Sequence, residues 1–256
     1  QKINLTFAEI EKLEKIFNYY DQQSELFELN KNAARQPIRV SESLFSVVKK
    51  TIEFSRLTEG AFDPTVHSPN KQTSYKNIIL NGEEKTIFFD RKGLTIDLGG
   101  CAKGYIVDQA AKKLKEFGIK SFLINAGGDI IAGGKKWRIG IQHPLIENKI
   151  LKVLNLKNKA IASSGNYLRL HIINPQDKKA AQRGILSVTV ISDSCFKSDI
   201  LATAFFVLGK DKTLKLIKSL KDDIKGFVVF EQGGKIKIVQ LKNGVELIIK
   251  QSGRAR

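Results

Sequence analysis

The sequence predicts an α+β fold, a layered architecture of mixed sheets flanked by helices. Some segments carry apolar residues at helical spacing and others are short β-branched runs, without the strict strand and helix alternation of a parallel sheet. No internal repeat, low-complexity segment or linker interrupts the 256 residues. We therefore expect one domain over residues 1–256, built of two intimately packed halves.

The first sixty residues predict helices. Thr6 and Glu9 have the spacing of a capping box, so we expect Thr6 to be the N-cap of the first helix. Gly60–Pro64 is expected to be a loop, because the residue before a proline is pushed to extended geometry. The helical segments are an apolar stripe from Phe7 to Tyr20, a short helix or turn over Ser24–Asn30, and a helix from about Ser41 that ends before Gly60.

Short apolar and β-branched runs predict strands over much of the remaining chain. Asn81-Gly82 indicates a hairpin between the first two of them. The strand candidates are Lys76–Asn81, Thr86–Asp90, Leu94–Leu98, Ser121–Ile124, Trp137–Gln142, Leu151–Leu156, Leu168–Asn174, Ile185–Ile191, Gly226–Glu231 and Lys235–Leu241. Helices are expected over Ala102–Phe117, Ser198–Leu208 and Thr213–Leu220, and small-residue turns at Asn125–Asp129 and Ala160–Asn166.

The stretch from Asp97 to Tyr105 joins a predicted strand to a predicted helix through paired glycines. A helix N-terminus presents unpaired N–H groups and a partial positive charge, and glycines let a phosphate approach the backbone closely. The stretch is therefore a candidate phosphate site. The alternative is an ordinary turn between a strand and a helix.

Asp199 and Thr203 are four residues apart in a predicted helix, so a carboxylate and a hydroxyl share one face. Hard oxygen ligands of this kind suit Mg²⁺ rather than zinc. The spacing taken alone is more typical of a charge near a helix N-terminus and a residue at the edge of the core.

His171 precedes Ile172-Ile173-Asn174-Pro175 on a segment predicted to be extended. An imidazole titrates near neutral pH and suits proton transfer, although a single histidine is more often structural. His67 is likewise single. His143 stands before Pro144 after a predicted strand and is interpreted as a turn residue.

The formal net charge of +17 favours polyanionic partners in general. The lysines are scattered along the polar sides of predicted helices, without an aromatic-interleaved basic tract, so we expect solvated surfaces and no nucleic-acid partner. No apolar run approaches the roughly 18–20 residues of a membrane span. Cys101 and Cys195 lack metal-ligand spacing and are either reduced core residues or a disulfide.

Several segments, taken in order, resemble the signatures of the ApbE family of flavin transferases. The resemblance covers roughly Phe17 to Gly209, and the shared order makes it far more specific than any one motif. The segments are Ser24-Glu25-Leu26 with Asn30, Gly60–Thr65, Asp97–Tyr105 with Asp108, Asn125–Asp129, Ser164–Tyr167, His171–Pro175 and Asp199–Ala204.

The resemblance implies a Mg²⁺-dependent FAD:protein FMN transferase, a single ApbE-like domain. Such an enzyme moves FMN from FAD onto a Thr or Ser of an acceptor flavoprotein through a phosphoester bond and releases AMP. By position, the Gly100 carbonyl, Asp199 and Thr203 would hold Mg²⁺, and His171 would be the base that activates the acceptor hydroxyl. The flavin nucleotide would contact Tyr20, Ala61, Phe62, Asp63, Lys103 and Ile173.

Two other functions use the same residues. In a Mg²⁺-dependent FAD pyrophosphatase, water would replace the acceptor hydroxyl and the products would be FMN and AMP. A non-catalytic flavin-binding protein is the third hypothesis, and it would not need a metal on the pyrophosphate. The resemblance also implies an extracytoplasmic protein, attached as a lipoprotein to the outer side of the cytoplasmic membrane, and the basic charge would suit peripheral association with an anionic surface.

Overall fold

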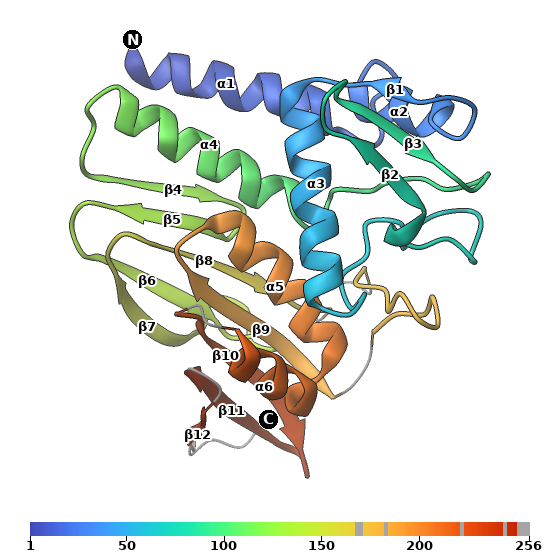
Figure 1. The fold of residues 1–256 in the computed structure, drawn as a ribbon. Helices are drawn as coiled ribbons and strands as arrows, with labels where there is room; N and C mark the ends of the chain where they lie inside the picture. Colours follow the sequence, from blue (N-terminus) through green and yellow to red (C-terminus); the bar gives the residue numbers. More distant parts are fainter. Residues whose placement is uncertain (167–170, 182–183, 221–222, 243–244, 250–256) are drawn as a thin grey trace.

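The fold is described from a computed structural model for residues 1–166, 171–181, 184–220, 223–242 and 245–249. Within these residues, twelve strands form three antiparallel sheets, and six α-helices pack with them in a layered arrangement (Figure 1). This confirms the α+β prediction. One cluster of buried hydrophobic side chains runs from Leu13 to Leu241 and joins the helical N-terminal part to the large sheet.

The six predicted helices are all present, but several of their ends differ from the prediction. The first helix begins at Lys2 and not at Thr6, whose hydroxyl lies inside the helix and donates to the Lys2 carbonyl at 3.1 Å, so the predicted capping box is wrong. Within the described residues, no helix combines the length and apolarity needed to cross a bilayer. The helices are α1 (Lys2–Phe17), α2 (Glu25–Asn32), α3 (Glu42–Leu57), α4 (Ala102–Glu116), α5 (Cys195–Leu208) and α6 (Lys210–Ser219), with a 3₁₀ turn at Tyr75–Asn77.

Serine side chains cap the N-termini of three of these helices. The hydroxyls of Ser24, Ser41 and Ser194 accept hydrogen bonds from backbone N–H groups in the first turns of α2, α3 and α5. The cap at Ser194 makes α5 begin at Cys195, three residues before the predicted start. Asp199 therefore lies in the second turn of α5 and not at its N-terminus.

The large sheet has seven strands in the order β12-β11-β10-β9-β8-β5-β4. Its strands β5 and β12 were not predicted. β8 occupies the segment predicted as a small-residue turn, because its alanines are buried beneath α5 and do not face solvent. The strands are β4 (Phe122–Ala126), β5 (Asp129–Gly133), β8 (Lys159–Ser164), β9 (Ile185–Ser192), β10 (Lys225–Gln232), β11 (Lys235–Lys242) and β12 (Val245–Ile249).

The two faces of this sheet are covered differently. Helices α4 and α5 cover one face (Figure 1). The two predicted strands β6 (Trp137–Gln142) and β7 (Ile150–Leu156) pair as an antiparallel hairpin that packs on the other face. The hairpin buries its side chains in a separate apolar cluster with the sheet. Its members include Ile130, Ile139, Ile141, Leu156, Phe227 and Val229.

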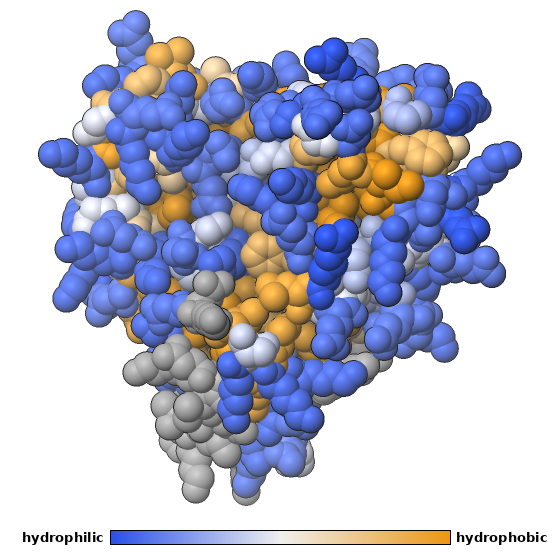
Figure 2. Space-filling model, in the orientation of Figure 1, coloured by the Kyte–Doolittle hydropathy of each residue, from blue (hydrophilic) through white to orange (hydrophobic). Residues whose placement is uncertain are grey.

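A second, three-stranded sheet lies beside α3. It contains β1 (Ile38–Arg39), β2 (Ile78–Asn81) and β3 (Thr86–Phe89) in the order β1-β3-β2, and the predicted hairpin around Asn81-Gly82 is confirmed. Hydrophilic side chains spread over most of the face shown in Figure 2, with apolar areas between them. This distribution agrees with solvated polar surfaces.

The segment Leu94–Leu98 is extended but is not a strand, which corrects the prediction. Two side chains take the place of a neighbouring strand. The amide of Asn30 pairs with the Ile96 backbone, donating to its carbonyl at 2.9 Å and accepting from its N–H at 2.7 Å. The Ser68 hydroxyl does the same for the Thr95 backbone, at 3.0 and 2.9 Å. The segment is thereby held rigidly where it enters the glycine turn.

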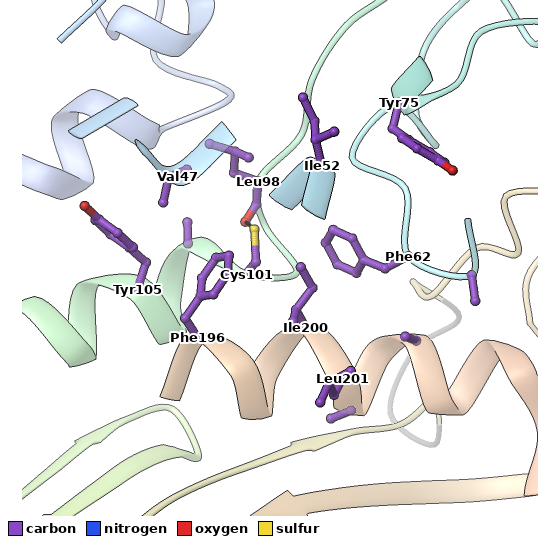
Figure 3. Packing of buried hydrophobic residues seen from close by; sticks show 14 of the residues in the cluster. Val47, Ile52, Phe62, Tyr75, Leu98, Cys101, Tyr105, Phe196, Ile200 and Leu201 are labelled. Atoms are coloured by element: carbon purple, nitrogen blue, oxygen red, sulfur yellow. Dashed lines mark hydrogen bonds between the residues drawn. The ribbon is translucent and has the colours of Figure 1, made fainter. Parts of the chain in front are cut away.

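Helices α4 and α5 approach closely at Gly104. A Cβ atom on Gly104 would lie 2.6 Å from the Cys195 carbonyl oxygen and 2.8 Å from the Phe196 Cα atom. Beside this contact, Tyr105 and Phe196 meet edge to face with ring centroids 6.2 Å apart, among the apolar residues shown in Figure 3. Cys101 and Cys195 are both free and buried in this structure, so they are core residues and do not form the alternative disulfide.

We predict that Gly104→Ala destabilises the protein by about 2 kcal/mol. Alanine is the better helix former by roughly 1 kcal/mol, but overpacking against backbone atoms costs about 1–3 kcal/mol or more and cannot be relieved by a side-chain rotation. Urea unfolding would measure the difference. Gly82→Ala is the matched control, because a Cβ atom there has nothing within 4 Å, and stability should change by less than about 0.5 kcal/mol. Equal stability of both variants would contradict the close crossing.

Candidate active site

The paired glycines form a tight turn that starts α4. The N–H groups of Cys101 and Ala102 both donate to the Leu98 carbonyl, at 2.9 and 2.7 Å. Cys101 occupies the N-cap position but makes no side-chain cap. The N-terminus of α4 is capped from α5 instead, because Asp199 Oδ2 accepts a hydrogen bond from the Gly104 N–H at 3.1 Å.

Asp199 is a buried carboxylate with incomplete compensation. Asp199 is 6% exposed. Burial, together with the nearby Asp129, raises the pKa of the Asp199 carboxyl well above the usual range. The Lys103 ammonium and the Gly104 N–H oppose this increase in pKa only in part. A carboxylate in this state would be stabilised by a bound cation.

Thr203 and Gly100 lie beside each other. The Thr203 hydroxyl is 3.1 Å from the Ser164 hydroxyl at the end of β8. A Cβ atom on Gly100 would lie 3.8 Å from Thr203 Oγ1 and 3.1 Å from the Phe62 ring. Since Thr203 is one turn after Asp199 on α5, the structure brings the predicted metal ligands to one place, against the ring of a predicted flavin contact.

Lys103 pairs with Asp129 across the start of α4. The Lys103 ammonium is 2.7 Å from Asp129 Oδ2, and the lysine side chain is 54% exposed while the aspartate side chain is 4% exposed. Asp129 ends the predicted turn over Asn125–Asp129, and this turn joins β4 to β5. Lys103 is therefore paired with the buried Asp129 but remains partly exposed to solvent, next to the residue whose N–H binds Asp199.

The loop over Ala61, Phe62 and Asp63 is fixed by the Asp63 carboxylate. Asp63 Oδ1 accepts from the N–H and the hydroxyl of Thr65, each at 2.8 Å, and Oδ2 accepts from the Tyr75 N–H at 3.1 Å. Burial raises the pKa of Asp63, and these hydrogen bonds oppose the increase. The carboxylate is therefore engaged within the protein and fixes the backbone of this loop.

Two adjoining hollows flank this loop. A groove of about 350 Å³ runs from Ala61 to the end of α5 and to α6. A second, of about 430 Å³, is lined by Asp63, Tyr75 and Pro175. Both include Glu59 and Gln176, so the loop lies between two depressions that share a rim.

The segment that carries His171 and Ile173 is held by Asn166. The Asn166 side-chain oxygen accepts from the N–H groups of His171 and Ile172, at 3.2 and 2.9 Å, and its amide donates to Ile172 and Ala181 carbonyls at 3.2 and 3.1 Å. Ile173 forms a bridge with Ala180. His171 is exposed at the surface. The first three residues of the extended segment predicted over Leu168–Asn174 lie outside the described residues.

Tyr20 and the two other histidines come from other segments of the chain. Tyr20 is 86% exposed on the connection between α1 and α2, with its ring edge-on to Tyr19. His67 Nε2 is 3.8 Å from Asp97 Oδ2. His143 is a turn residue as predicted, because its Nδ1 accepts from the N–H groups of Leu145 and Ile146.

Comparison with known proteins agrees with these motifs. A family model described as "ApbE family" matches residues 2–71 and 68–228. The chain belongs to the ApbE family. The FAD:protein FMN transferase of Haemophilus influenzae is 30% identical over 258 residues, covering 82% of this chain and 75% of that protein. The FAD:protein FMN transferase of Vibrio cholerae is 28% identical over 263 residues, covering 88% and 79%.

Solved ApbE structures share the fold. The flavin transferase ApbE from Vibrio cholerae superposes with a TM-score of 0.83 at 26% identity, covering 94% of this chain and 89% of that one. The ApbE protein from Thermotoga maritima gives a TM-score of 0.81 at 28% identity, covering 92% and 87%. The ApbE fold predicted from the motifs is therefore confirmed.

Asp108 is a residue of the ApbE motif to which the sequence assigned no role. Its carboxylate accepts from the Ser194 hydroxyl at 2.6 Å and from the N–H groups of Cys195 and Phe196 at 2.7 and 3.0 Å. An α4 side chain thus caps α5, while Asp199 of α5 caps α4. This reciprocal capping fixes the position of Asp199. It depends on residues 86–95 positions apart, which periodicity within one helix cannot detect.

Proposed function

We propose that this chain is a Mg²⁺-dependent FAD:protein FMN transferase that attaches FMN through a phosphoester bond to a Thr or Ser of an acceptor flavoprotein and releases AMP. One observation carries the proposal. The buried, incompletely compensated Asp199 carboxylate lies at the N-terminus of α4 beside Thr203 and Gly100. A cation and a phosphate would both be stabilised there.

The donor chemistry fits Mg²⁺. Asp199, the Thr203 hydroxyl and the Gly100 carbonyl would supply hard oxygen ligands, with the remaining positions left to phosphate oxygens and water. The described residues contain no group of three or more His, Cys, Asp or Glu side chains suited to a metal, which argues against a zinc-type site in that part of the chain. When bound, Mg²⁺ would polarise the pyrophosphate and stabilise the departing AMP.

The flavin nucleotide would lie along the N-terminus of α4. The half-exposed Lys103 ammonium would pair with phosphate oxygens, and the backbone of Ala61–Asp63 would contact the nucleotide between the two hollows. Ile173 and the exposed Tyr20 ring would complete the site from other parts of the chain. These roles follow the positions of the family motif.

The transfer step needs a base for the acceptor hydroxyl, and we assign it to His171. The hydroxyl oxygen forms a bond to the FMN phosphorus while the bond from that phosphorus to the bridging oxygen breaks, and AMP leaves with that oxygen. The hydroxyl proton passes to His171 and then to solvent. The two hydrogen bonds that the His171 and Ile172 N–H groups donate to the Asn166 side chain would hold the segment in place.

The acceptor would present its Thr or Ser on a flexible segment able to reach the exposed His171. Attachment of the protein to the outer side of the cytoplasmic membrane, as a lipoprotein, belongs to the same proposal.

A product analysis tests the function. The protein is incubated with FAD and MgCl₂, with and without a candidate flavoprotein domain, and products are followed by mass spectrometry. We expect AMP together with an acceptor heavier by one FMN moiety. AMP and free FMN irrespective of acceptor would identify a pyrophosphatase, and intact bound FAD would identify a flavin-binding protein.

Asp199→Asn should lower Mg²⁺-dependent FAD turnover by about 100-fold or more, because the amide carries no charge for a cation. The thermal unfolding midpoint should stay unchanged or rise. The raised pKa of Asp199 means that its ionised form is disfavoured in the folded state, and the amide removes that cost. Asp193→Asn, on an exposed side chain near the start of α5, is the control. Full turnover by Asp199→Asn would remove the metal assignment.

His171→Ala should slow FMN transfer to the acceptor by about 10²–10⁴-fold while leaving FAD affinity within about twofold of wild type. A base acts on the acceptor hydroxyl and not on bound FAD, so the two measurements should separate. Transfer would be followed by acceptor mass and FAD affinity by flavin fluorescence. Wild-type transfer by this variant would contradict the assignment.

A further inference from the structure

The turn over Asn125–Asp129 has no role in the proposed chemistry, yet it is built tightly. Gly127 and Gly128 have φ values of 62° and 101°, a left-handed conformation that glycine adopts without strain. The Asn125 side-chain oxygen accepts from the Gly128 N–H at 2.9 Å. Asp129 is thereby fixed as the first residue of β5, directly opposite Ala126.

Asp129 is the partner of Lys103. Its Oδ2 lies 2.7 Å from the Lys103 ammonium, and its side chain is 4% exposed. Burying a carboxylate is costly unless it is paired, so this ion pair differs from the exposed pairs on the surface. The lysine is also the residue before Gly104, whose N–H reaches Asp199.

Lys103 therefore has two buried carboxylates within its electrostatic reach. Its charge acts on both Asp129 and Asp199, while Asp129 and Asp199 repel each other. Counting these three groups as ionised, the cluster has a net charge of −1. Without the Asp129 charge the net charge would be zero, and the ammonium would have Asp199 as its remaining partner in this cluster.

We propose that Asp129 is a positioning residue that holds the Lys103 ammonium away from Asp199. Asp199 then stays open to a divalent cation together with Thr203 and the Gly100 carbonyl, and Lys103 stays directed toward the nucleotide phosphates. The proposal rests on the metal site of the proposed function. It assigns to the Asn125–Asp129 turn the role of presenting this carboxylate beneath α4.

Mn²⁺ binding in the absence of FAD tests the proposal, because Mn²⁺ accepts the same oxygen ligands as Mg²⁺ and free Mn²⁺ is counted directly by electron paramagnetic resonance. Asp129→Asn should bind Mn²⁺ about tenfold more weakly than wild type, since the freed ammonium competes for Asp199. Lys103→Gln should bind at least as tightly as wild type. The double variant should recover to within about threefold of wild type.

The rescue by Lys103→Gln is the deciding result. If Asp129 only supported the fold, the Asp129→Asn protein would not regain Mn²⁺ affinity when Lys103 is also replaced by Gln. Wild-type affinity in Asp129→Asn, no recovery in the double variant, or a wild-type protein that binds no Mn²⁺ would each overturn the proposal. If Asp129→Asn does not fold, a weaker affinity in Lys103→Gln than in wild type would overturn it.

Two further measurements complete the design. Asp223→Asn is the matched control, because Asp223 pairs with Lys159 and Lys225 at the surface, and its Mn²⁺ affinity should equal that of wild type. Acceptor flavinylation is measured separately on the same proteins. If no FMN is transferred but the variants show the expected Mn²⁺ affinities, the proposed function is rejected and the role of Asp129 is retained. If FMN is transferred but the Mn²⁺ affinities differ from those expected, the proposed function is retained and the role of Asp129 is rejected.

Discussion

The close crossing of α4 and α5 is the constraint on which the candidate site depends. The backbones approach at Gly104, where a side chain would collide with the Cys195 carbonyl. Each helix caps the other, through Asp108 in one direction and Asp199 in the other. Because capping hydrogen bonds and backbone contact are both directional, they leave the two helices little freedom to slide. Asp199 is thus held at the N-terminus of α4, where a phosphate would be favoured.

The charges at this crossing are arranged at a cost to stability. Asp199 and Asp129 are both buried, and burial raises the pKa of each, so neither carboxylate is placed where folding alone would favour it. Lys103 offsets part of the cost but remains half exposed. Buried groups with strongly shifted pKa values gather where a protein binds or transforms ligands. The cluster has the character of a binding site more than of a structural ion pair.

Segments that border the site are irregular but firmly held. Asn30 replaces a strand neighbour for Ile96, and Asn166 does so for Ile172. An asparagine side chain carries the same donor and acceptor as a peptide group, so one residue can satisfy backbone that no sheet reaches. Both segments are held by these side-chain hydrogen bonds. They lead to the glycine turn in one case and to His171 in the other.

The sequence by itself determined the α+β class, most helices, the hairpin around Asn81-Gly82, and the family, because local periodicity and short ordered motifs are properties of neighbouring residues. It did not predict the starts of α1 and α5, the strand β8, or the non-strand character of Leu94–Leu98. Those depend on which distant groups satisfy the backbone. The convergence of Gly100, Asp199 and Thr203 followed from the motifs, but the parts played by Asp108 and Asp129 did not. Only the tertiary structure decided them, since their partners lie 86–88 residues away for Asp108 and on another element for Asp129.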